Sequence, residues 1–364
     1  MNMPLIRPNV LQLEPYSPGK PIDEVKRELG LTDVVKLASN ENPLGPSPRA
    51  IEAAMQAMQS VNLYPDGSCF ELRQAVAKHV KVPAECLLFG NGSDELIHFI
   101  GLTFLMPGDE VITGHPSFVR YEAAAQLNNA PLHLVPLREH RFDLPAILER
   151  VNDRTKLIFI ANPNNPTGTI VTAEEVEAFM NALPEHVVVV WDQAYQEYVS
   201  RADYPDTLRY VREGRNVIVL RTFSKAYALA GLRVGYAIAR PEIIDAMNRV
   251  REPFNVNSVA QAAALAALQD HEHLRRAVEL NRHGLDYFYR HFERLGLRYV
   301  RSEANCVMVD LARDSKPVFD QLLRKGVIVR TGHIFGLPTY LRITTGKPED
   351  NERFISALEE VLQA

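Results

Sequence analysis

Residues 217–233 read VIVLRTFSKAYALAGLR, and this stretch decides the fold. It opens on a continuous apolar run, Val217–Leu220, which is typical of a strand buried on both faces of a parallel sheet. Lys225 follows among hydroxyl and small side chains, and Arg233 comes eight positions later. A single lysine usually lies on the surface. Here, however, the hydroxyls and the guanidinium can bind an anion, and an amine with a lowered pKa can form a Schiff base. We therefore predict that Lys225 belongs to a ligand site.

Two other apolar runs lead into polar residues in the same way. Residues 187–191 precede Asp192 and Tyr195, and residues 157–161 precede a turn rich in Asn and Pro at 162–168. Ligands of open α/β sheets gather beyond the carboxyl ends of parallel strands. We therefore expect these side chains and Lys225 at one edge of one mostly parallel sheet. Taken singly, each motif has a structural alternative, since Asp192 could cap a helix and residues 162–168 could form an ordinary turn.

The composition disfavours several classes of protein. A length of 364 residues favours two domains, and a net charge of −5 gives no basic surface for nucleic acid. The three cysteines are scattered and lack metal-ligand spacing, so we predict a reducing compartment. His271-Glu272-His273 looks most like a metal site, but it has no further ligands nearby in the sequence, so we predict a helix surface there and no metal. No apolar segment approaches the length of a membrane span, about 20 residues, and the proline-broken start has no signal-peptide core. We expect a cytoplasmic protein without membrane or nucleic-acid partners.

The pattern of the sequence divides the chain into three parts. Residues 1–45 are rich in proline and predict an N-terminal arm that contributes part of the small domain. Residues 46–255 alternate strand and helix patterns and predict the large domain. Residues 256–364 predict a small α+β domain, which begins with an alanine-rich helical stretch to about 295 that is broken near Gly284. Further strands are expected at 305–311, 327–330 and 340–344, with helices at 315–325 and 349–363.

Three motifs resemble the signature of the fold-type I pyridoxal-phosphate aminotransferases. They are, in chain order, Asn164–Gly168, Asp192-x-x-Tyr195, and Ser224-Lys225 with Arg233. The resemblance covers nearly the whole chain. It implies an α/β large domain with a mostly parallel central sheet between helices, a smaller α+β domain, pyridoxal 5'-phosphate as the cofactor, and a homodimer with shared active sites. Gln193 and Ala228 depart from the family pattern, in which glutamate and glycine are common, and Ala228 leaves the local backbone geometry open.

The resemblance also implies roles around the cofactor ring. Lys225 would hold the cofactor's aldehyde as a Schiff base and would later move a proton from the α-carbon of the substrate. Asp192 would keep the pyridine nitrogen protonated. Asn165 and Tyr195 would bond the phenolic oxygen, and Phe118 would stack on the ring.

The phosphate of the cofactor would be held at the start of a helix. The residues implied are Thr222, Ser224 and Arg233, together with the turn Gly92-Ser93-Asp94, whose N–H groups and helix dipole favour an anion. Ser93 could instead be a helix cap alone, because capping and phosphate binding use the same geometry. Tyr64 resembles a tyrosine that reaches the cofactor phosphate of the neighbouring subunit, and a core or surface position is its alternative.

The substrate is indicated by an arginine in a strand pattern. Arg342 has apolar neighbours and needs an anionic partner there, and it matches the family's arginine for the substrate carboxylate. The finer resemblance, through residues 38–48, 64–66, 329–331 and 341–344, is to the histidinol-phosphate aminotransferases. It implies that Tyr16, Asn40, Arg330 and Arg342 bind substrate. The reaction would convert histidinol phosphate and 2-oxoglutarate to imidazole-acetol phosphate and glutamate, in histidine biosynthesis.

Three alternatives use parts of the same scaffold. An aromatic-amino-acid (phenylpyruvate) aminotransferase shares most of the motifs and needs a ring-sized pocket. A pyridoxal-phosphate decarboxylase of an amino-acid phosphate would release CO₂ instead of a keto product. A ligand sensor would keep the fold without turnover, but the chain has no basic helix-turn-helix extension, and both Lys225 and Asp192 are present.

Overall fold

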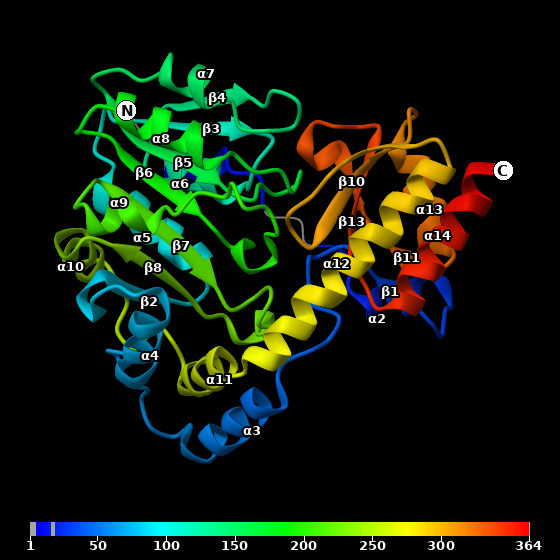
Figure 1. The fold of residues 1–364 in the computed structure, drawn as a ribbon, viewed down its shortest axis with the longest axis horizontal. Coiled ribbons are helices and arrows are strands. Elements are labelled where there is room, and N and C mark those ends of the chain that lie inside the picture. The colour runs from blue at the N-terminus through cyan, green and yellow to red at the C-terminus, as the bar shows by residue number, and fades with distance from the viewer. Residues whose placement is uncertain (1–4, 16–18, 364) are drawn as a thin grey trace.

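The computed structural model describes residues 5–15 and 19–363, and its largest element is a seven-stranded sheet (Figure 1). Its neighbouring strands are, in order, β2 (Leu87–Gly90), β8 (Gly235–Ala239), β7 (Val217–Thr222), β6 (Val188–Asp192), β5 (Thr155–Ala161), β3 (Glu110–His115) and β4 (Leu132–Pro136). The strands are parallel except for β8, which runs antiparallel to both of its neighbours. The predicted α/β class with a mostly parallel central sheet is confirmed.

The buried runs of the sequence form the centre of this sheet. All residues of β6 and β7 are buried, as expected for strands that helices cover on both sides. Ala161 of β5 lies opposite Asp192 of β6, which lies opposite Leu220 of β7. The three strands therefore end at one edge, and the polar residues that follow them come together there.

Helices surround the sheet, and several begin with a side-chain cap. Ser47 caps α3, and Thr172 with Glu175 forms a capping box at the start of α8. The helices are α1 (Pro8–Leu11), α2 (Ile22–Leu29), α3 (Pro48–Ala57), α4 (Phe70–Val80), α5 (Ser93–Phe104), α6 (Arg120–Leu127), α7 (Leu144–Leu148), α8 (Ala173–Ala182), α9 (Leu208–Arg212), α10 (Pro241–Arg249), α11 (Ser258–Gln269), α12 (His271–Arg294), α13 (Ser315–Arg324) and α14 (Pro348–Gln363). Short 3-10 turns are η1 (Met58–Ser60), η2 (Ala84–Cys86), η3 (Gln196–Tyr198), η4 (Ala230–Leu232) and η5 (Gly332–Phe335).

A smaller sheet forms a second layer with the C-terminal helices. Its strands are β12 (Arg330–Thr331), β13 (Tyr340–Thr344), β10 (Cys306–Asp310) and β9 (Arg298–Val300), all antiparallel. The N-terminal part of the chain joins this region, because β1 (Val35–Lys36) pairs in parallel with β11 (Val327–Ile328). Figure 1 shows this blue segment beside the orange and red C-terminal elements, while α12 runs between the two regions.

The alanine-rich stretch behaves differently from the sequence prediction. The helical stretch is interrupted at Asp270, whose side chain caps α12 by accepting a hydrogen bond from His273 N, and Gly284 lies inside α12. A Cβ at Gly284 would lie 3.1 Å from Thr345 Cβ, so the glycine allows close packing and does not end the helix. The predicted domain boundary at 255/256 also differs from the packing, since the alanines of α11 belong to the core of the large sheet and α11 contacts α3 and α4. Small side chains permit this close approach between helices.

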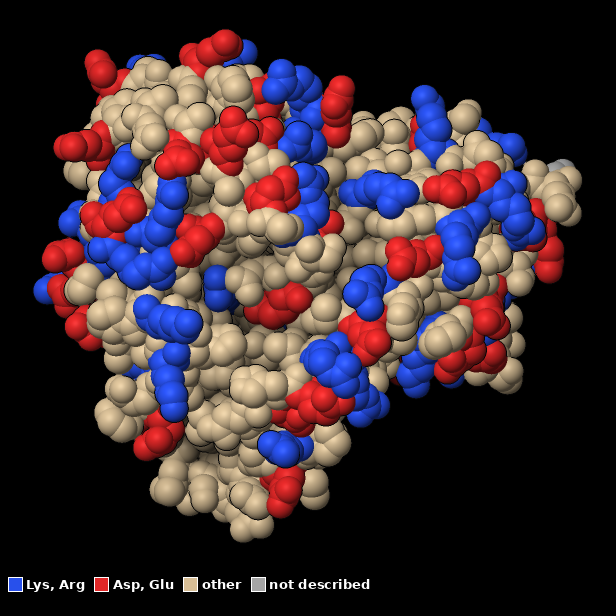
Figure 2. All heavy atoms as spheres, in the orientation of Figure 1, with Lys and Arg blue, Asp and Glu red and all other residues tan. Residues whose placement is uncertain are grey.

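The surface carries both signs of charge. On the face shown in Figure 2, basic and acidic side chains alternate over most of the molecule, while the lower part, around α3 and α11, carries few charges. Among the described residues, no helix has the length and apolar character needed to cross a membrane.

Candidate active site

Lys225 lies in the loop after β7, partly buried between the two sheets. Its Nζ donates to Asn40 O over 3.3 Å and sits 5.5 Å from the centre of the Tyr195 ring. Burial, with the nearby positive charge of Arg342, lowers the pKa of Lys225 to about 8. The amine can therefore exchange a proton close to neutral pH, which is the property that a catalytic lysine needs.

Asp192, the last residue of β6, is a buried carboxylate at the edge of the large sheet. Its Oδ2 accepts a hydrogen bond of 2.7 Å from the Tyr121 hydroxyl, and its Oδ1 accepts one of 3.1 Å from Ala194 N. Burial raises the pKa of Asp192 to about 6, although both hydrogen bonds favour the charged form. A bound cation would offset this burial penalty.

Tyr195 lies above the same edge of the sheet. Its hydroxyl oxygen accepts a hydrogen bond of 2.9 Å from Asn40 Nδ2. Burial raises the pKa of Tyr195, so the phenol keeps its proton at neutral pH. The predicted residues Lys225, Tyr195 and Asn40 thus form one contact group.

Arg342 of β13 brings the small sheet to this group. Its Nη1 donates to Asn165 Oδ1 over 2.7 Å and its Nη2 to Ala38 O over 2.6 Å, and the ring of Phe335 lies 5.4 Å from its Cζ. The side chain is buried, and among the described residues its Nε has no hydrogen-bond partner. A buried guanidinium that lacks an ionic partner is a site for an anion.

A second anion cradle lies at the start of α5. Gly92 precedes Ser93, the first residue of this helix, and Arg233 reaches across so that its Nη1 lies 3.3 Å from Ser224 Oγ. Arg233 Nη2 lies 3.5 Å from Asp94 Oδ2. Gly92 has a φ of +81°, and a Cβ there would lie 2.3 Å from Arg233 Nη2. The Arg233 guanidinium therefore lies against the start of α5 with no side chain of residue 92 between them, and N–H groups at a helix start favour an anion.

The remaining large-domain predictions lie at the margin of this group. Thr222 Oγ1 accepts from Ser224 N over 3.1 Å and approaches Val234 O at 3.4 Å, so its hydroxyl supports the Ser224 loop. Its direct contact with a phosphate stays a prediction. Phe118 meets Tyr121 edge to face with ring centres 5.7 Å apart, which places it one contact from Asp192.

Three other predicted residues have different positions. Arg330 of β12 lies opposite Arg342 in the register of the small sheet. Tyr16 lies outside the described residues. Tyr64 is 83% exposed and stacks on Phe254 with ring centres 4.8 Å apart. In this single chain it is a surface residue, and its role towards a second subunit stays a prediction.

Several residues of the site were not predicted from the sequence. Tyr121 bonds Asp192, Thr344 bonds Asn40, Phe335 covers Arg342, and Cys306 Sγ lies 3.4 Å from Asn40 Nδ2. The one available signal for Tyr121 was its position as a second aromatic residue, three positions after Phe118. The others depend on contacts between distant parts of the chain.

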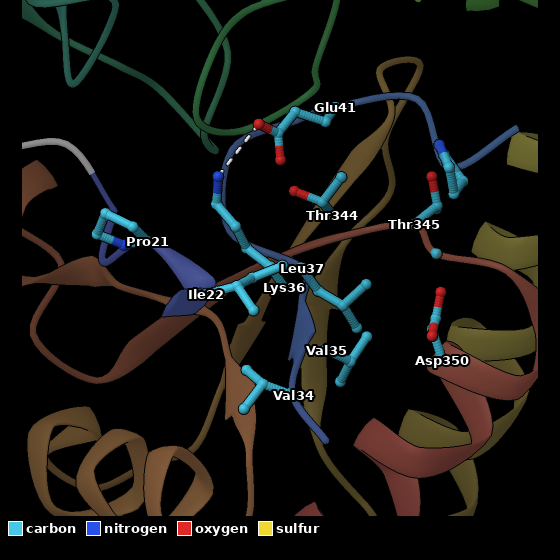
Figure 3. A pocket seen from close by; sticks show the side chains of 12 residues that line it. Pro21, Ile22, Val34, Val35, Lys36, Leu37, Glu41, Thr344, Thr345 and Asp350 are labelled. Atoms are coloured by element: carbon cyan, nitrogen blue, oxygen red, sulfur yellow. Dashed lines mark hydrogen bonds and ion pairs between the residues drawn. The ribbon is translucent and has the colours of Figure 1, made fainter. Parts of the chain in front are cut away.

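A cavity of about 470 Å³ opens next to this group, on the side of β1 (Figure 3). The Lys36–Glu41 ion pair, at 3.1 Å, stands beside Thr344 in its wall. Within the described part of the chain, none of the residues predicted for the site lines this cavity. Thr344 is its link to the site, because that residue also bonds Asn40.

The comparison with known proteins agrees with this geometry. The profile of the family described as "Aminotransferase class I and II" matches residues 32–358. The chain belongs to this family. The resemblance inferred from the sequence motifs is confirmed. Two curated relatives of this aminotransferase are the histidinol-phosphate aminotransferases of Moorella thermoacetica, 54% identical with 99% of this chain and 94% of the relative covered, and of Caldicellulosiruptor saccharolyticus, 50% identical with 98% and 100% covered.

Solved structures show the same fold for this aminotransferase. The histidinol-phosphate aminotransferase of Sinorhizobium meliloti, in complex with pyridoxal-5'-phosphate, superimposes with a TM-score of 0.91 at 30% identity, with 99% of this chain and 98% of that chain covered. The aspartate aminotransferase of Thermus thermophilus with maleate gives a TM-score of 0.86 at 26% identity, with 99% and 100% covered.

Proposed function

We propose that this aminotransferase uses pyridoxal 5'-phosphate to move the amino group of histidinol phosphate to 2-oxoglutarate, giving imidazole-acetol phosphate and glutamate. The observation that carries the proposal is the position of Arg342. This buried residue lies near the amine of Lys225, and its Nε lacks a hydrogen-bond partner among the described residues. The similarity to histidinol-phosphate aminotransferases over 99% of the chain supports this choice of substrate. We place the protein in the cytoplasm and in histidine biosynthesis.

The residues present fit the cofactor. The cradle of Gly92, Ser93 and Arg233 suits its phosphate, and the buried carboxylate of Asp192 suits a protonated pyridine nitrogen. Tyr195 and Asn165 would hold its phenolic oxygen. Lys225 would hold its aldehyde carbon, Phe118 would lie against its ring, and Ser224, Thr222 and Asp94 would complete the phosphate end. When bound, the cofactor supplies an electron sink for the carbanion that forms at the substrate's α-carbon.

The protein's own residues then have distinct tasks. Lys225 Nζ, released when the substrate amine takes its place on the aldehyde carbon and with a pKa lowered to about 8, would take the proton from the α-carbon and pass it to that aldehyde carbon. The carboxylate of Asp192, held by Tyr121, would pair with the pyridine nitrogen of the cofactor and keep that nitrogen protonated. The positive charge of this nitrogen would in turn favour the ionised form of Asp192. The two hydrogen bonds of Arg342, to Asn165 and to Ala38 O, hold its guanidinium at the junction of the two sheets, where it would bind the substrate anion.

Arg342 suits both half-reactions because the paired N–H groups of a guanidinium bind phosphate and carboxylate alike. Histidinol phosphate would present its phosphate to Arg342, and glutamate would present a carboxylate in the same direction. Arg330 lies opposite Arg342 in the sheet and would add positive charge, while Asn40 and Tyr16 would complete the substrate side. An aromatic amino acid also carries a carboxylate, so it remains the second candidate substrate.

The deciding experiment compares half-reactions of the purified, cofactor-loaded enzyme. We expect histidinol phosphate to convert the bound cofactor far faster than phenylalanine does. A preference for phenylalanine would refute the histidine-pathway substrate, and release of CO₂ from an amino-acid phosphate without a keto product would show a decarboxylase.

Attachment of the cofactor is tested separately. Borohydride reduction followed by peptide mapping should label Lys225. Lys225→Ala should lose the label and the visible absorption of the bound cofactor, whereas Lys78→Ala, on the exposed surface of α4, should keep both. A label at any other lysine would contradict the assignment.

We also propose that the enzyme works as a homodimer in which Tyr64 reaches the partner's cofactor phosphate. Several exposed apolar residues lie close to Tyr64 in the chain, namely Ile51, Met55, Met58, Val61 and Leu63. Burying such a surface against a second copy is favourable. Mixing the Lys225→Ala and Tyr64→Ala variants would build one intact site in each hybrid dimer, so activity should recover. A monomeric protein in light scattering, or a mixture without recovery, would contradict the shared site.

A further inference from the structure

Asn40 sits at the centre of a buried hydrogen-bond network that joins the two sheets. Its backbone N–H donates to Thr344 Oγ1 over 2.9 Å, and the Thr344 hydroxyl donates to Asn40 Oδ1 over 3.0 Å. On its other side Asn40 Nδ2 donates to the Tyr195 hydroxyl oxygen over 2.9 Å and lies 3.4 Å from Cys306 Sγ. Asn40 O accepts from Lys225 Nζ over 3.3 Å. Both Asn40 and Thr344 are buried, so water does not replace these contacts.

The direction of the Asn40 amide decides what the hydrogen of Tyr195 can do. With Nδ2 towards Tyr195, the phenol oxygen accepts and its own hydrogen is available to a ligand. With the amide turned over, Oδ1 would face Tyr195 and would take that hydrogen. The two amide orientations have nearly the same shape, so hydrogen bonds choose between them.

The hydroxyl of Thr344 makes that choice. Thr344 Oγ1 already accepts the Asn40 backbone N–H, and its hydrogen is directed at Oδ1. A turned amide would place NH₂ against Thr344 Oγ1 and leave the threonine hydrogen without this acceptor, at the cost of an unsatisfied buried donor. Thr344 is the last residue of β13, two positions after Arg342. It also lines the cavity shown in Figure 3, together with Leu37 and Thr345.

We propose that Thr344 is a positioning residue: its hydroxyl fixes the Asn40 amide with Nδ2 towards Tyr195, so that Tyr195 keeps its hydrogen for the phenolic oxygen of the cofactor. This inference rests on the proposed function, because it requires the cofactor beside Tyr195. Thr344 itself touches neither cofactor nor substrate in this assignment. It acts through Asn40 and Tyr195.

The test measures the pH at which the visible absorption of the cofactor-loaded enzyme changes. Donation from Tyr195 withdraws negative charge from the phenolic oxygen, so its loss strengthens the hold on the neighbouring proton and raises this midpoint. We expect Thr344→Val to raise the midpoint by about half to one pH unit, the equivalent of one hydrogen bond. Thr344→Ser keeps the hydroxyl and should keep the wild-type midpoint. The charged or titratable neighbours of Tyr195 are unchanged in both variants; they are Asp192, Lys225, Cys306, Arg342, Tyr121 and Tyr198.

A double-mutant cycle shows whether the effect passes through Tyr195. In a Tyr195→Phe background, Thr344→Val should cause no further shift. A midpoint that is the same in Thr344→Val and Thr344→Ser, or a Thr344→Val shift that persists in full without the Tyr195 hydroxyl, would overturn the inference. Thr344→Ala removes the same hydroxyl and takes the place of Thr344→Val if that variant does not fold. A wild-type protein that binds no pyridoxal phosphate would instead refute the proposed function, and this inference with it.

Discussion

Replacing Asp192 by asparagine should change how the stability of the cofactor-free protein depends on pH. Burial raises the pKa of Asp192 from 3.8 to about 6 in the folded chain. Between these two values the folded protein binds a proton that the unfolded chain releases. The contribution of Asp192 therefore destabilises the fold progressively as pH rises through this window, and it levels off above the folded pKa. The amide that replaces the carboxyl in Asp192→Asn cannot ionise, so the variant escapes this loss.

The size of the effect can be worked out from the shift. At about 1.36 kcal/mol for each unit, a rise of about two units corresponds to about 3 kcal/mol in full. Between pH 5 and pH 7 the linkage relation assigns about 1.3 kcal/mol to Asp192. The free energy of unfolding of Asp192→Asn, minus that of the wild type, should increase by this amount over the same interval.

Urea unfolding of the cofactor-free proteins at pH 5, 6 and 7 measures this difference. Trp191 is the sole tryptophan, is buried and precedes Asp192, so its fluorescence reports on the site. Both proteins must be compared at one concentration, because self-association would add to stability. Glu197, whose pKa burial raises to about 7, is present in both and cancels. A difference that stays constant or decreases as pH rises would refute the assignment of a buried, destabilised carboxylate.

Three further predictions concern single contacts. Arg342→Gln should raise KM for histidinol phosphate and for 2-oxoglutarate by about 10- to 100-fold, which is the value of a charged hydrogen bond, and should retain the cofactor absorption. The control variant Arg298→Gln, which changes an 82% exposed side chain, should leave KM unchanged. Gly92→Ala should weaken cofactor binding, measured by equilibrium dialysis, by about tenfold or more, because its Cβ would displace Arg233, and Gly231→Ala, which has open space, should not. Ala228 holds a φ of +58°, so Ala228→Gly should relieve strain and leave the protein as stable or up to about 1 kcal/mol more stable in thermal unfolding, and a loss above that size would contradict the strain.

The large-domain half of the site could be predicted because of a simple geometric rule. Asp192 and Lys225 come at or after the ends of buried apolar runs, and parallel strands bring the residues at their carboxyl ends to one edge of the sheet. The register, which aligns Ala161, Asp192 and Leu220, meets this expectation. Tyr121 was not predicted because its importance comes from a hydrogen bond to Asp192, 71 positions away, and its place three positions after Phe118 is a weak local signal.

The alanine-rich stretch shows why local patterns fail at packing contacts. Gly284 looks like a helix breaker in the sequence, but it is a point of close approach to Thr345. The real break, at Asp270, is made by a side chain that caps α12 and also accepts from Ser47 Oγ over 2.5 Å. The role of Gly284 cannot be inferred without knowing which segment lies opposite, whereas the cap at Asp270 is a local contact with His273 N that was not predicted.

The contacts of Asn165 and Asn40 suggest how the two sheets act as one site. Arg342 of the small sheet binds Asn165 at the edge of the large sheet, and Thr344 binds Asn40, which binds Tyr195. An anion bound by Arg342 would be a stronger acceptor than the neutral oxygen of Asn165, so it would draw the guanidinium towards itself. Asn165 is also one of the two residues proposed to hold the cofactor's phenolic oxygen. In the proposed assignment the charge of the substrate would therefore be linked to the cofactor through one amide, and the small sheet must lie against the large one for either asparagine to keep its contacts.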